Sequence, residues 1–492
     1  MQGLIGRLGD SAAHLVGGAG QALPVADCVT LAGALADRLT DAGARCAGIR
    51  LDNGPDWIVA DLACTLAGVP CVPIPAFFTP GQVAHVLGAS GMDAVFSADD
   101  PRQAGFDVFR RSQTVAGLWL APRRERTVPP DAARVTFTSG TTGTPRGVCL
   151  TQAQQDQVAT TLAAATEFLG LRRHLSALPL AVLLENVAGV YAALASGADV
   201  VVPPLAEVGL RGSSGFDPAV LASAIDRHRP HSLILLPQML KALVAWARAH
   251  DRRFDSLRFV AVGGARTAPE LIVAARALGI PAYEGYGLTE ACSVVCVNLP
   301  GADRPGSVGR PLPHQSVRVG ATGEIEVRTG FPVRYLGEDA PRAGWLATGD
   351  VGRVDGDGFV HVHGRRKQVI VTSFGRNVSP EWVESELLAE AAVVQAMVFG
   401  DDLPALGALL VPAPGATLAA LGSAVARANA RLPDYARVGG WRAAEPFSPG
   451  RGELTANGRP RRDRIAETRN DGIAAIRHDI ETTNTGERHG VL

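Results

Sequence analysis

Hydroxyl side chains and glycines are concentrated in residues 137–148, where the sequence is Phe-Thr-Ser-Gly-Thr-Thr-Gly-Thr-Pro-Arg-Gly-Val. The segment overlaps the end of a strand-like run at residues 134–137. Backbone N–H and side-chain O–H groups of such a loop can surround phosphate oxygens, because glycine lets the backbone approach closely. The segment is not a Walker P-loop, since no Gly-Lys-Ser/Thr follows at the required spacing. Composition alone leaves a flexible turn and a phosphate cradle equally open.

Cysteine and histidine spacing predicts neither a metal site nor a redox centre. The chain has 7 cysteines and no Cys-x-x-Cys pair, which argues against a zinc ribbon or a disulfide framework. Cys292 and Cys296 have the spacing of one helix face, and two buried core thiols are the preferred interpretation. His361 and His363 share a strand face with no cysteine or acidic cluster nearby, so we expect exposed strand histidines rather than a metal pair.

The elements that must position the hydroxyl-rich segment alternate between helix and strand. Helical patterns and apolar strand-like runs follow one another at residues 57–66, 69–74, 93–96, 218–228, 232–236 and 259–262. This order predicts a largely parallel sheet that is covered on both faces. From residue 323 the pattern alternates polar with apolar residues, as at 324–328 and 359–363, and this predicts half-exposed antiparallel strands.

The last part of the chain resembles a separate small α+β unit, with a helix at 378–390 and strands at 393–399 and 408–411. We therefore predict an α/β fold, in which a large multi-layer N-terminal domain with mixed sheets is joined by a hinge to a small α+β C-terminal domain. The predicted boundaries are 1–366 for the first domain and 367–469 for the second. Residues 470–492 are polar and without clear periodicity, so a disordered tail is expected there.

Six segments, in order along the chain, resemble the signature motifs of the adenylate-forming superfamily. That family includes acyl-CoA synthetases, the adenylation domains of peptide synthetases, and firefly luciferase. The resemblance covers roughly residues 30–465, and its six segments are 137–148, 262–265 (Val-Gly-Gly-Ala), 283–290 (Tyr-Glu-Gly-Tyr-Gly-Leu-Thr-Glu), 344–350 (Gly-Trp-Leu-Ala-Thr-Gly-Asp), 364–367 (Gly-Arg-Arg-Lys) with 375–381, and 453–459 (Glu-Leu-Thr-Ala-Asn-Gly-Arg).

The resemblance implies a role for each matching residue. It implies ATP phosphate binding by Thr138, Ser139, Gly140, Thr141, Thr142, Gly143 and Arg146. Gly264, Ala265, Tyr286 and Gly287 would contact adenine, with Tyr286 supplying an aromatic face. Asp350 would accept hydrogen bonds from the ribose hydroxyls, with Arg365 close by. Thr289 would bind the α-phosphate, Glu290 would hold Mg²⁺ through a hard oxygen, and Lys367 would mark the domain hinge.

Two arginines depart from the family pattern. The family has lysine at the position of Arg146, and its catalytic lysine corresponds to Arg459. Only Lys241 and Lys367 among the 47 basic residues are lysine, which is the signature of a coding bias. That bias readily explains the replacement of lysine by arginine at a surface site. It explains the same replacement at a catalytic site less well, because a guanidinium lacks the compact geometry of an ammonium group.

Substrate and acceptor are less well defined by the sequence. Residues 178–186 lack an aspartate that could fix an α-amino group, so an apolar acyl or aryl acid is favoured over an amino acid. Three functions remain open: an acyl-CoA ligase using ATP, Mg²⁺ and CoA, an adenylating enzyme that loads a carrier protein, an amine or a hydroxyl, and a degenerate nucleotide-binding protein. The CoA ligase is preferred.

Composition excludes several other classes of protein. Hydrophobic residues make up 47% and charged residues 19% of the 492 residues, which is typical of a globular chain of more than one domain. The net charge of −1 gives no basic footprint for nucleic acid. No signal pattern and no apolar run long enough for a membrane span is present, so a soluble cytoplasmic protein is expected.

Overall fold

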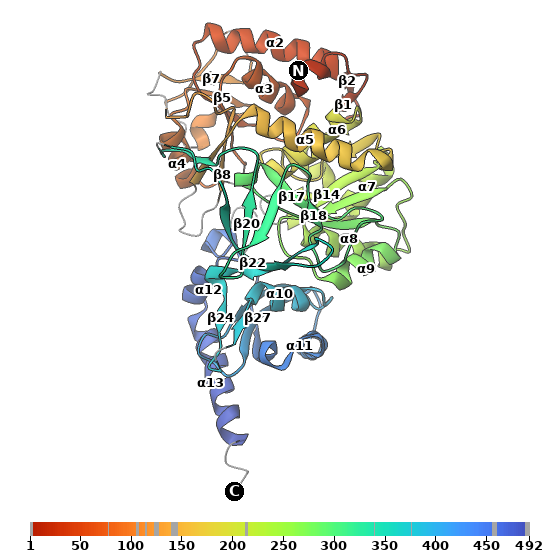
Figure 1. The fold of residues 1–492 in the computed structure, drawn as a ribbon, viewed down its shortest axis with the longest axis vertical. Helices are drawn as coiled ribbons and strands as arrows, with labels where there is room; N and C mark the ends of the chain where they lie inside the picture. The colour runs from red at the N-terminus through yellow and green to blue at the C-terminus, as the bar shows by residue number, and fades with distance from the viewer. Residues whose placement is uncertain are drawn as a thin grey trace.

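The computed structural model describes residues 3–487 apart from residues 77, 105–107, 114–115, 123–126, 139–145, 212–214, 339, 375 and 455–459. Two large mixed sheets form the upper part of the molecule in Figure 1, a four-stranded antiparallel sheet lies below them, and the C-terminal unit, in blue, is at the bottom. This arrangement confirms the predicted α/β class with a large N-terminal part and a smaller C-terminal one.

The first large sheet carries the flanks of the hydroxyl-rich segment. Its eight strands lie in the order β21 (Arg334–Tyr335), β9 (Arg146–Leu150), β8 (Arg134–Thr138), β4 (Cys71–Pro73), β3 (Ala47–Arg50), β5 (Ala94–Ser97), β7 (Leu118–Leu120) and β6 (Arg110–Arg111). Pairing is parallel among β8, β4, β3 and β5 and antiparallel at both edges. Helices α2 (Val25–Asp41), α3 (Pro55–Leu66) and α4 (Pro80–Ser90) belong to the same part of the chain.

The second large sheet has a parallel centre. Its nine strands lie in the order β18 (Arg310–Pro311), β17 (Ser293–Val297), β16 (Ala282–Leu288), β15 (Phe259–Val262), β14 (Ser232–Leu235), β10 (Arg173–Leu175), β11 (Asp199–Val201), β1 (His14–Val16) and β2 (Ala22–Pro24). Its helices are α5 (Gln152–Thr166), the π-helix η3 (Leu184–Tyr191), α6 (Ala192–Ala195), α7 (Pro218–His228), α8 (Pro237–Ala249) and α9 (Pro269–Ala277). One core contains residues of both sheets, and a second contains residues of α7, α8 and α9.

The antiparallel strands predicted from polar–apolar alternation are present. They form the sheet β19 (Ser316–Val319), β20 (Glu324–Arg328), β22 (Leu346–Val354) and β23 (Val360–Arg365). The chain then continues into the C-terminal unit, which comprises β24 (Ile370–Val371), β25 (Asn377–Val378), α10 (Pro380–Leu388), β26 (Val393–Phe399), β27 (Leu406–Pro412), α11 (Leu418–Arg431), β28 (Val438–Ala443), α12 (Arg462–Thr468) and α13 (Asn470–Glu487). Strands β26, β27 and β28 form its sheet.

The expectation of a disordered tail at residues 470–492 is wrong for most of that segment, because residues Asn470–Glu487 form α13. Ile473, Ile476 and Ile480 recur at helical spacing, and their side chains are buried against the sheet of the C-terminal unit. A Cβ atom on Gly440 of β28 would lie 2.9 Å from Ile480 and 3.0 Å from Ile476, so the helix fits closely over the glycines of that strand. Because polar residues separate the three isoleucines, the sequence pattern did not indicate a helix with a short apolar stripe.

Candidate active site in the cleft between the two units

A single cleft of about 2340 Å³ contains the predicted site residues that the structure describes. Its walls come from the carboxyl ends of β14, β15 and β16, from β22 and β23, and from the C-terminal unit. The lining includes Thr138, Arg146, Gly264, Ala265, Tyr286, Gly287, Thr289, Glu290, Asp350, Arg365 and Lys367. Residues that are up to 229 positions apart in the chain (Thr138 to Lys367) therefore face one space.

Asp350 and Arg365 meet because β22 and β23 pair in register at these two residues. Arg365 Nε lies 2.9 Å from Asp350 Oδ1, and Tyr286 donates its hydroxyl hydrogen to Asp350 Oδ2 at 2.6 Å. The Asp350 side chain is 8% exposed, and Arg365 also donates to the carbonyl oxygen of Thr348 at 2.9 Å. Burial and the neighbouring carboxylate raise the pKa of Tyr286 well above its usual value. The group is a fixed carboxylate with a cation and a phenol beside it.

Thr289 and Glu290 begin a short 3-10 helix directly after β16. Tyr335 of β21 donates a hydrogen bond to Glu290 Oε1 at 3.0 Å, and the Arg146 guanidinium lies 3.9 Å from the centre of the Tyr335 ring. Arg146 also forms an ion pair with Glu338 at 2.9 Å. Burial and Glu290 raise the pKa of Tyr335 to about 12. Tyr335 thus joins the end of the hydroxyl-rich segment to Glu290, a contact that the sequence did not predict.

The backbone around Gly287 permits the tight return from β16 to β17. A Cβ atom on Gly287 would lie 1.6 Å from the carbonyl oxygen of Ser293, so a side chain is excluded there. Cys292 and Ser293 have φ of 57° and 93°, a conformation that non-glycine residues rarely adopt. Cys292 and Cys296 are both buried free thiols, as expected, but they lie in a turn and a strand rather than on one helix face.

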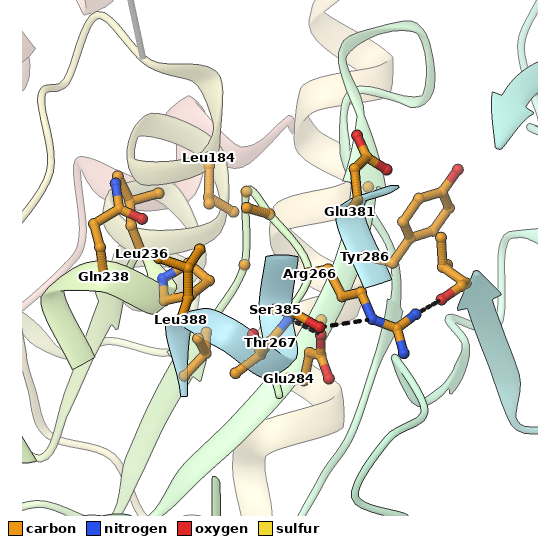
Figure 2. A pocket seen from close by; sticks show the side chains of 18 of the residues that line it. Leu184, Leu236, Gln238, Arg266, Thr267, Glu284, Tyr286, Glu381, Ser385 and Leu388 are labelled. Carbon is orange, nitrogen blue, oxygen red and sulfur yellow. Dashed lines mark hydrogen bonds between the residues drawn. The ribbon is translucent and has the colours of Figure 1, made fainter. Parts of the chain in front are cut away.

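The segment after β15 carries Gly264 and Ala265 into the cleft and continues to Arg266 (Figure 2). Gly264 has φ of 85°, which favours glycine. Arg266 donates to Ser385 Oγ of α10 at 3.3 Å and to the carbonyl oxygen of Val362. Beneath it, the buried carboxylate of Glu284 accepts a hydrogen bond from the Thr267 N–H at 3.0 Å, and burial raises the pKa of Glu284 to about 7.

A second residue of the N-terminal part also holds the C-terminal unit. Lys241 of α8 donates to the carbonyl oxygens of Glu390 and Val393 at 2.7 and 2.5 Å, just beyond the end of α10. Burial lowers the pKa of Lys241 to about 8, partly offset by the charge of Glu390. Three contacts connect α10 and the residues just beyond it to the rest of the chain. Lys241 and Arg266 make two of them, and in the third the Arg365 N–H donates to Glu381 Oε2 at 3.2 Å.

Several predicted residues lie outside the described residues, namely Ser139, Gly140, Thr141, Thr142, Gly143 and Arg459. Their flanks are placed: Thr138 ends β8, Arg146 begins β9, and the two residues pair in an antiparallel register. Leu454 and Pro460, on either side of Arg459, both line the cleft. Lys367 is exposed in the 3-10 helix Arg366–Gln368, which follows β23 directly.

The carboxylate of Glu290 suits a metal ion whose remaining ligands are phosphate oxygens. Within the described part of the chain, no group of three or more His, Cys, Asp or Glu side chains could hold an ion by itself. Glu290 offers a single carboxylate in the cleft, which fits the way Mg²⁺ is bound by few protein oxygens and by substrate phosphates. Of the two strand histidines, His363 is exposed as expected, whereas His361 is half-buried, with its Nε2 2.9 Å from Asp355 Oδ2.

Family models match both parts of the chain. The model described as AMP-binding enzyme matches residues 9–330, and the model described as AMP-binding enzyme C-terminal domain matches residues 367–481. Feruloyl-CoA synthase of Amycolatopsis sp is 30% identical over 435 residues, which is 81% of this chain and 85% of that protein. The long-chain-fatty-acid–CoA ligase FadD15 of Mycobacterium bovis is 35% identical over 201 residues, but the match spans only 34% of that protein.

Solved structures share the fold. O-succinylbenzoate Coenzyme A synthetase (MenE) of Bacillus subtilis in complex with AMP has a TM-score of 0.76 at 24% identity, covering 94% of this chain and 98% of that one. None of the described helices combines the length and the apolarity needed to cross a membrane.

Proposed function

The chain belongs to the AMP-binding enzyme family, and from this premise we propose that it uses ATP to activate a carboxylic acid as an acyl-adenylate and then transfers the acyl group to the thiol of CoA. The relatives named above act on feruloyl and long-chain fatty acyl groups, so both an aryl acid and an aliphatic acid are compatible with the family. The apolar acyl or aryl acid favoured by the sequence lies within that range.

The observation that carries the proposal is the fixed Asp350–Arg365–Tyr286 group in the same cleft as Glu290 and Arg146. A buried carboxylate held by a cation is a good acceptor for two vicinal hydroxyls, as on ribose. Arg146 and the hydroxyl-rich segment would bind the phosphates. Glu290 would hold Mg²⁺, which when bound neutralises phosphate charge.

Two half-reactions require two sets of groups in one cleft. In adenylation a carboxylate oxygen of the acid attacks the α-phosphorus, the bond to the β-phosphate oxygen breaks, and pyrophosphate leaves. In this proposal Thr289 would donate a hydrogen bond to the α-phosphate, and Arg459 would stabilise the negative charge that develops there. In transfer the thiol sulfur attacks the acyl carbon and AMP leaves. We propose that the C-terminal unit, from residue 367 to 469 together with α13, turns about Lys367 between the two steps.

The direct test is pyrophosphate release from ATP and Mg²⁺ with a panel of aryl and aliphatic acids, with and without CoA. Acid-dependent release followed by a CoA thioester is expected. Release without thioester formation would favour a carrier protein, an amine or a hydroxyl as acceptor. No release with any acid would contradict the proposal and leave a nucleotide-binding protein, the alternative that Arg459 raises.

Arg459 gives a sharper version of this test. Arg459→Lys is expected to adenylate as fast as the natural chain or faster, because a compact ammonium suits two converging oxyanions better than a planar fork. Arg459→Ala is expected to lose about a hundred- to a thousand-fold in pyrophosphate release. Transfer from a preformed acyl-adenylate should be retained in both variants. Unchanged pyrophosphate release in both would show that Arg459 is not catalytic.

A further inference from the structure

The cleft continues from the proposed adenylation site into a channel between the second large sheet and the helices that cover it. On the sheet side, Phe259 and Ala261 of β15 and Gly263 just beyond it are alternate residues and share one face. On the helix side, η3, α6 and the residue after α6 line the channel at a spacing of four residues, with Leu184, Ala188, Ala192 and Ser196. One strand face and one helix face therefore line the channel along its length.

Two close approaches show in which direction the helix crosses the sheet. A Cβ atom on Gly263, beyond the carboxyl end of β15, would lie 3.7 Å from Leu184 Cδ2 at the start of η3. Later in η3, a Cβ atom on Gly189 would lie 2.8 Å from Nε2 of His174, which is in register with the first residues of β14 and β15. The helix therefore runs from the carboxyl ends of these strands, beside the proposed adenylation site, towards their amino ends.

The far end of the channel opens at the surface of the molecule. The lining continues beyond β14 and β15 to Thr166 of α5, Leu171 before β10 and Ser196 after α6. Ser196 lines the cleft and is exposed to solvent. The channel thus has a second opening, away from the proposed adenylation site.

The length of the channel follows from the elements that line it. The sheet side from Gly263 to Phe259 spans about 13 Å, at about 3.3 Å per residue. The helix side from Gly189 to Ser196 adds about 10 Å, at about 1.5 Å per residue. The whole channel is therefore roughly 20 Å long. An extended alkyl chain with bonds of about 1.52 Å and angles of about 111° advances about 1.25 Å per carbon atom, so about sixteen carbon atoms fill this length.

The walls of the channel offer a ligand no charge with which to pair. The described residues of α5, η3, α6, β10, β14 and β15 that line it include no lysine, arginine, aspartate or glutamate. The hydroxyl groups of Thr166 and Ser196 donate to carbonyl oxygens of their own helices at 2.9 and 2.8 Å. His174 lies within hydrogen-bond distance of Ser232 and Glu185. A second carboxylate or an amine on the acid would be buried here without a partner, which is costly.

We propose that the acid is a long, unbranched aliphatic acid whose chain passes Ala261, Ala188 and Ala192 and whose methyl end reaches the opening at Ser196. This inference rests on the proposed function and specifies its substrate class. The three alanines leave room for methylene groups, and each methylene that enters the channel is removed from water, which favours binding. An aryl acid of ordinary size would fill only the part next to Gly263. Because the far end is open, acids longer than the channel remain substrates.

The test measures pyrophosphate release against chain length, with hexanoic, decanoic, tetradecanoic and octadecanoic acids below the concentrations at which they form micelles. For the natural chain, kcat/KM is expected to rise at least about tenfold from hexanoic to decanoic acid, because the added methylenes are buried. It should not fall from tetradecanoic to octadecanoic acid, because the end of the longer chain leaves through the opening. 4-Phenylbutanoic acid, with as many carbon atoms as decanoic acid, should have a kcat/KM at least about tenfold below that of decanoic acid.

Two variants probe two depths of the channel. Ala192→Phe places a ring in its far half and should lower kcat/KM for tetradecanoic acid at least about tenfold, while the value for hexanoic acid stays unchanged. Ser196→Trp narrows the exposed opening, so octadecanoic acid should become a poorer substrate than tetradecanoic acid. Ala164→Phe is the matched control, because Ala164 is an exposed residue of α5 that does not line the cleft. Its chain-length profile should equal that of the natural chain.

Three results would overturn the inference while leaving adenylation intact. The first is a higher kcat/KM for 4-phenylbutanoic acid or hexanoic acid than for tetradecanoic acid. The second is a fall between tetradecanoic and octadecanoic acid in the natural chain. The third is a natural profile in Ser196→Trp, which decides alone if Ala192→Phe is inactive with every acid because it does not fold. Absence of pyrophosphate release by the natural chain with every acid would contradict the proposed function itself, and this inference with it.

Discussion

Asp350 is held in place by two neighbouring side chains. It receives a phenol and a guanidinium at hydrogen-bond distance, so its oxygens are oriented before any ligand arrives. Orientation in advance lowers the entropy lost on binding. The arrangement is therefore expected to matter more for nucleotide affinity than for the chemical step.

Asp350→Asn should raise the KM for ATP by about tenfold to a hundredfold, with a smaller change in kcat. Charge-assisted hydrogen bonds of the kind proposed to ribose are worth about 1.5–3 kcal/mol, and the amide keeps the shape but loses the charge. Steady-state pyrophosphate release against ATP concentration measures this. Asp357→Asn is the control, because Asp357 is an exposed partner of Arg304. Equal KM values for the two variants would show that Asp350 does not bind the nucleotide.

Glu284 makes stability depend on pH. Its pKa is raised from 4.5 to about 7 in the folded chain, so the unfolded state releases this proton first as pH rises. Its contribution is fully present below about pH 4.5 and is lost as pH rises through 7, which amounts to about 3 kcal/mol. Glu284→Gln should show a smaller fall in unfolding free energy between pH 5 and pH 8 than the natural chain.

Denaturant unfolding at the two pH values measures this difference. Glu270→Gln on α9 is the matched control, since Glu270 is exposed. Its pH dependence should follow that of the natural chain. If Glu284→Gln also kept the full pH dependence, the carboxyl would already be charged in the folded state at pH 5.

At the level of elements, α13 is the feature that local sequence described least well. Three isoleucines among polar residues are too few to predict a helix in isolation, and the partners that bury them are glycine-bearing strands far away in the sequence. The strands with continuous apolar runs, such as β15 and β26, and the helix α7 with its aspartate cap were predictable, because their signals are local. Where the local sequence signal for a helix is weak, contacts with distant segments determine whether the helix forms.

Ile476→Ala should destabilise the C-terminal unit by about 2–5 kcal/mol, because it empties a fully buried position against β27 and β28. Hydrogen exchange of β26 to β28 should become faster than in the natural chain. His478→Ala, an exposed position two residues on, should leave exchange unchanged. Exchange that is equal in both variants would mean that α13 does not contribute to this core.

At the scale of the whole molecule, the order of the sequence motifs predicted the contents of the cleft, but not the contacts that join its parts. Asp350 and Arg365 could be paired from the resemblance, whereas Tyr335 with Glu290 and Lys241 with the end of α10 could not. Those contacts depend on how sheets and units pack, and no spacing in one chain encodes that. The contact between His174 and Ser232 was missed for the same reason, since these two residues meet only through strand register.

Lys241 is expected to stabilise the orientation of the C-terminal unit seen here. Its ammonium group makes two hydrogen bonds to carbonyl oxygens across the cleft, and together they are worth about 1–3 kcal/mol. Lys241→Gln should raise the population of other orientations and, with it, the rate of tryptic cleavage after Arg365, Arg366 or Lys367 by about tenfold. Arg248→Gln is the matched control, because Arg248 is an exposed cation on the same helix.

If the Lys241 and Arg248 variants were cleaved at the same rate as the natural chain, Lys241 would not hold the C-terminal unit in place. Arg266 and the contacts of α10 with β23 would then be sufficient to hold it. If Lys241→Gln alone were faster and ATP reduced the difference, the cleft and the hinge would be coupled as two alternating half-reactions require.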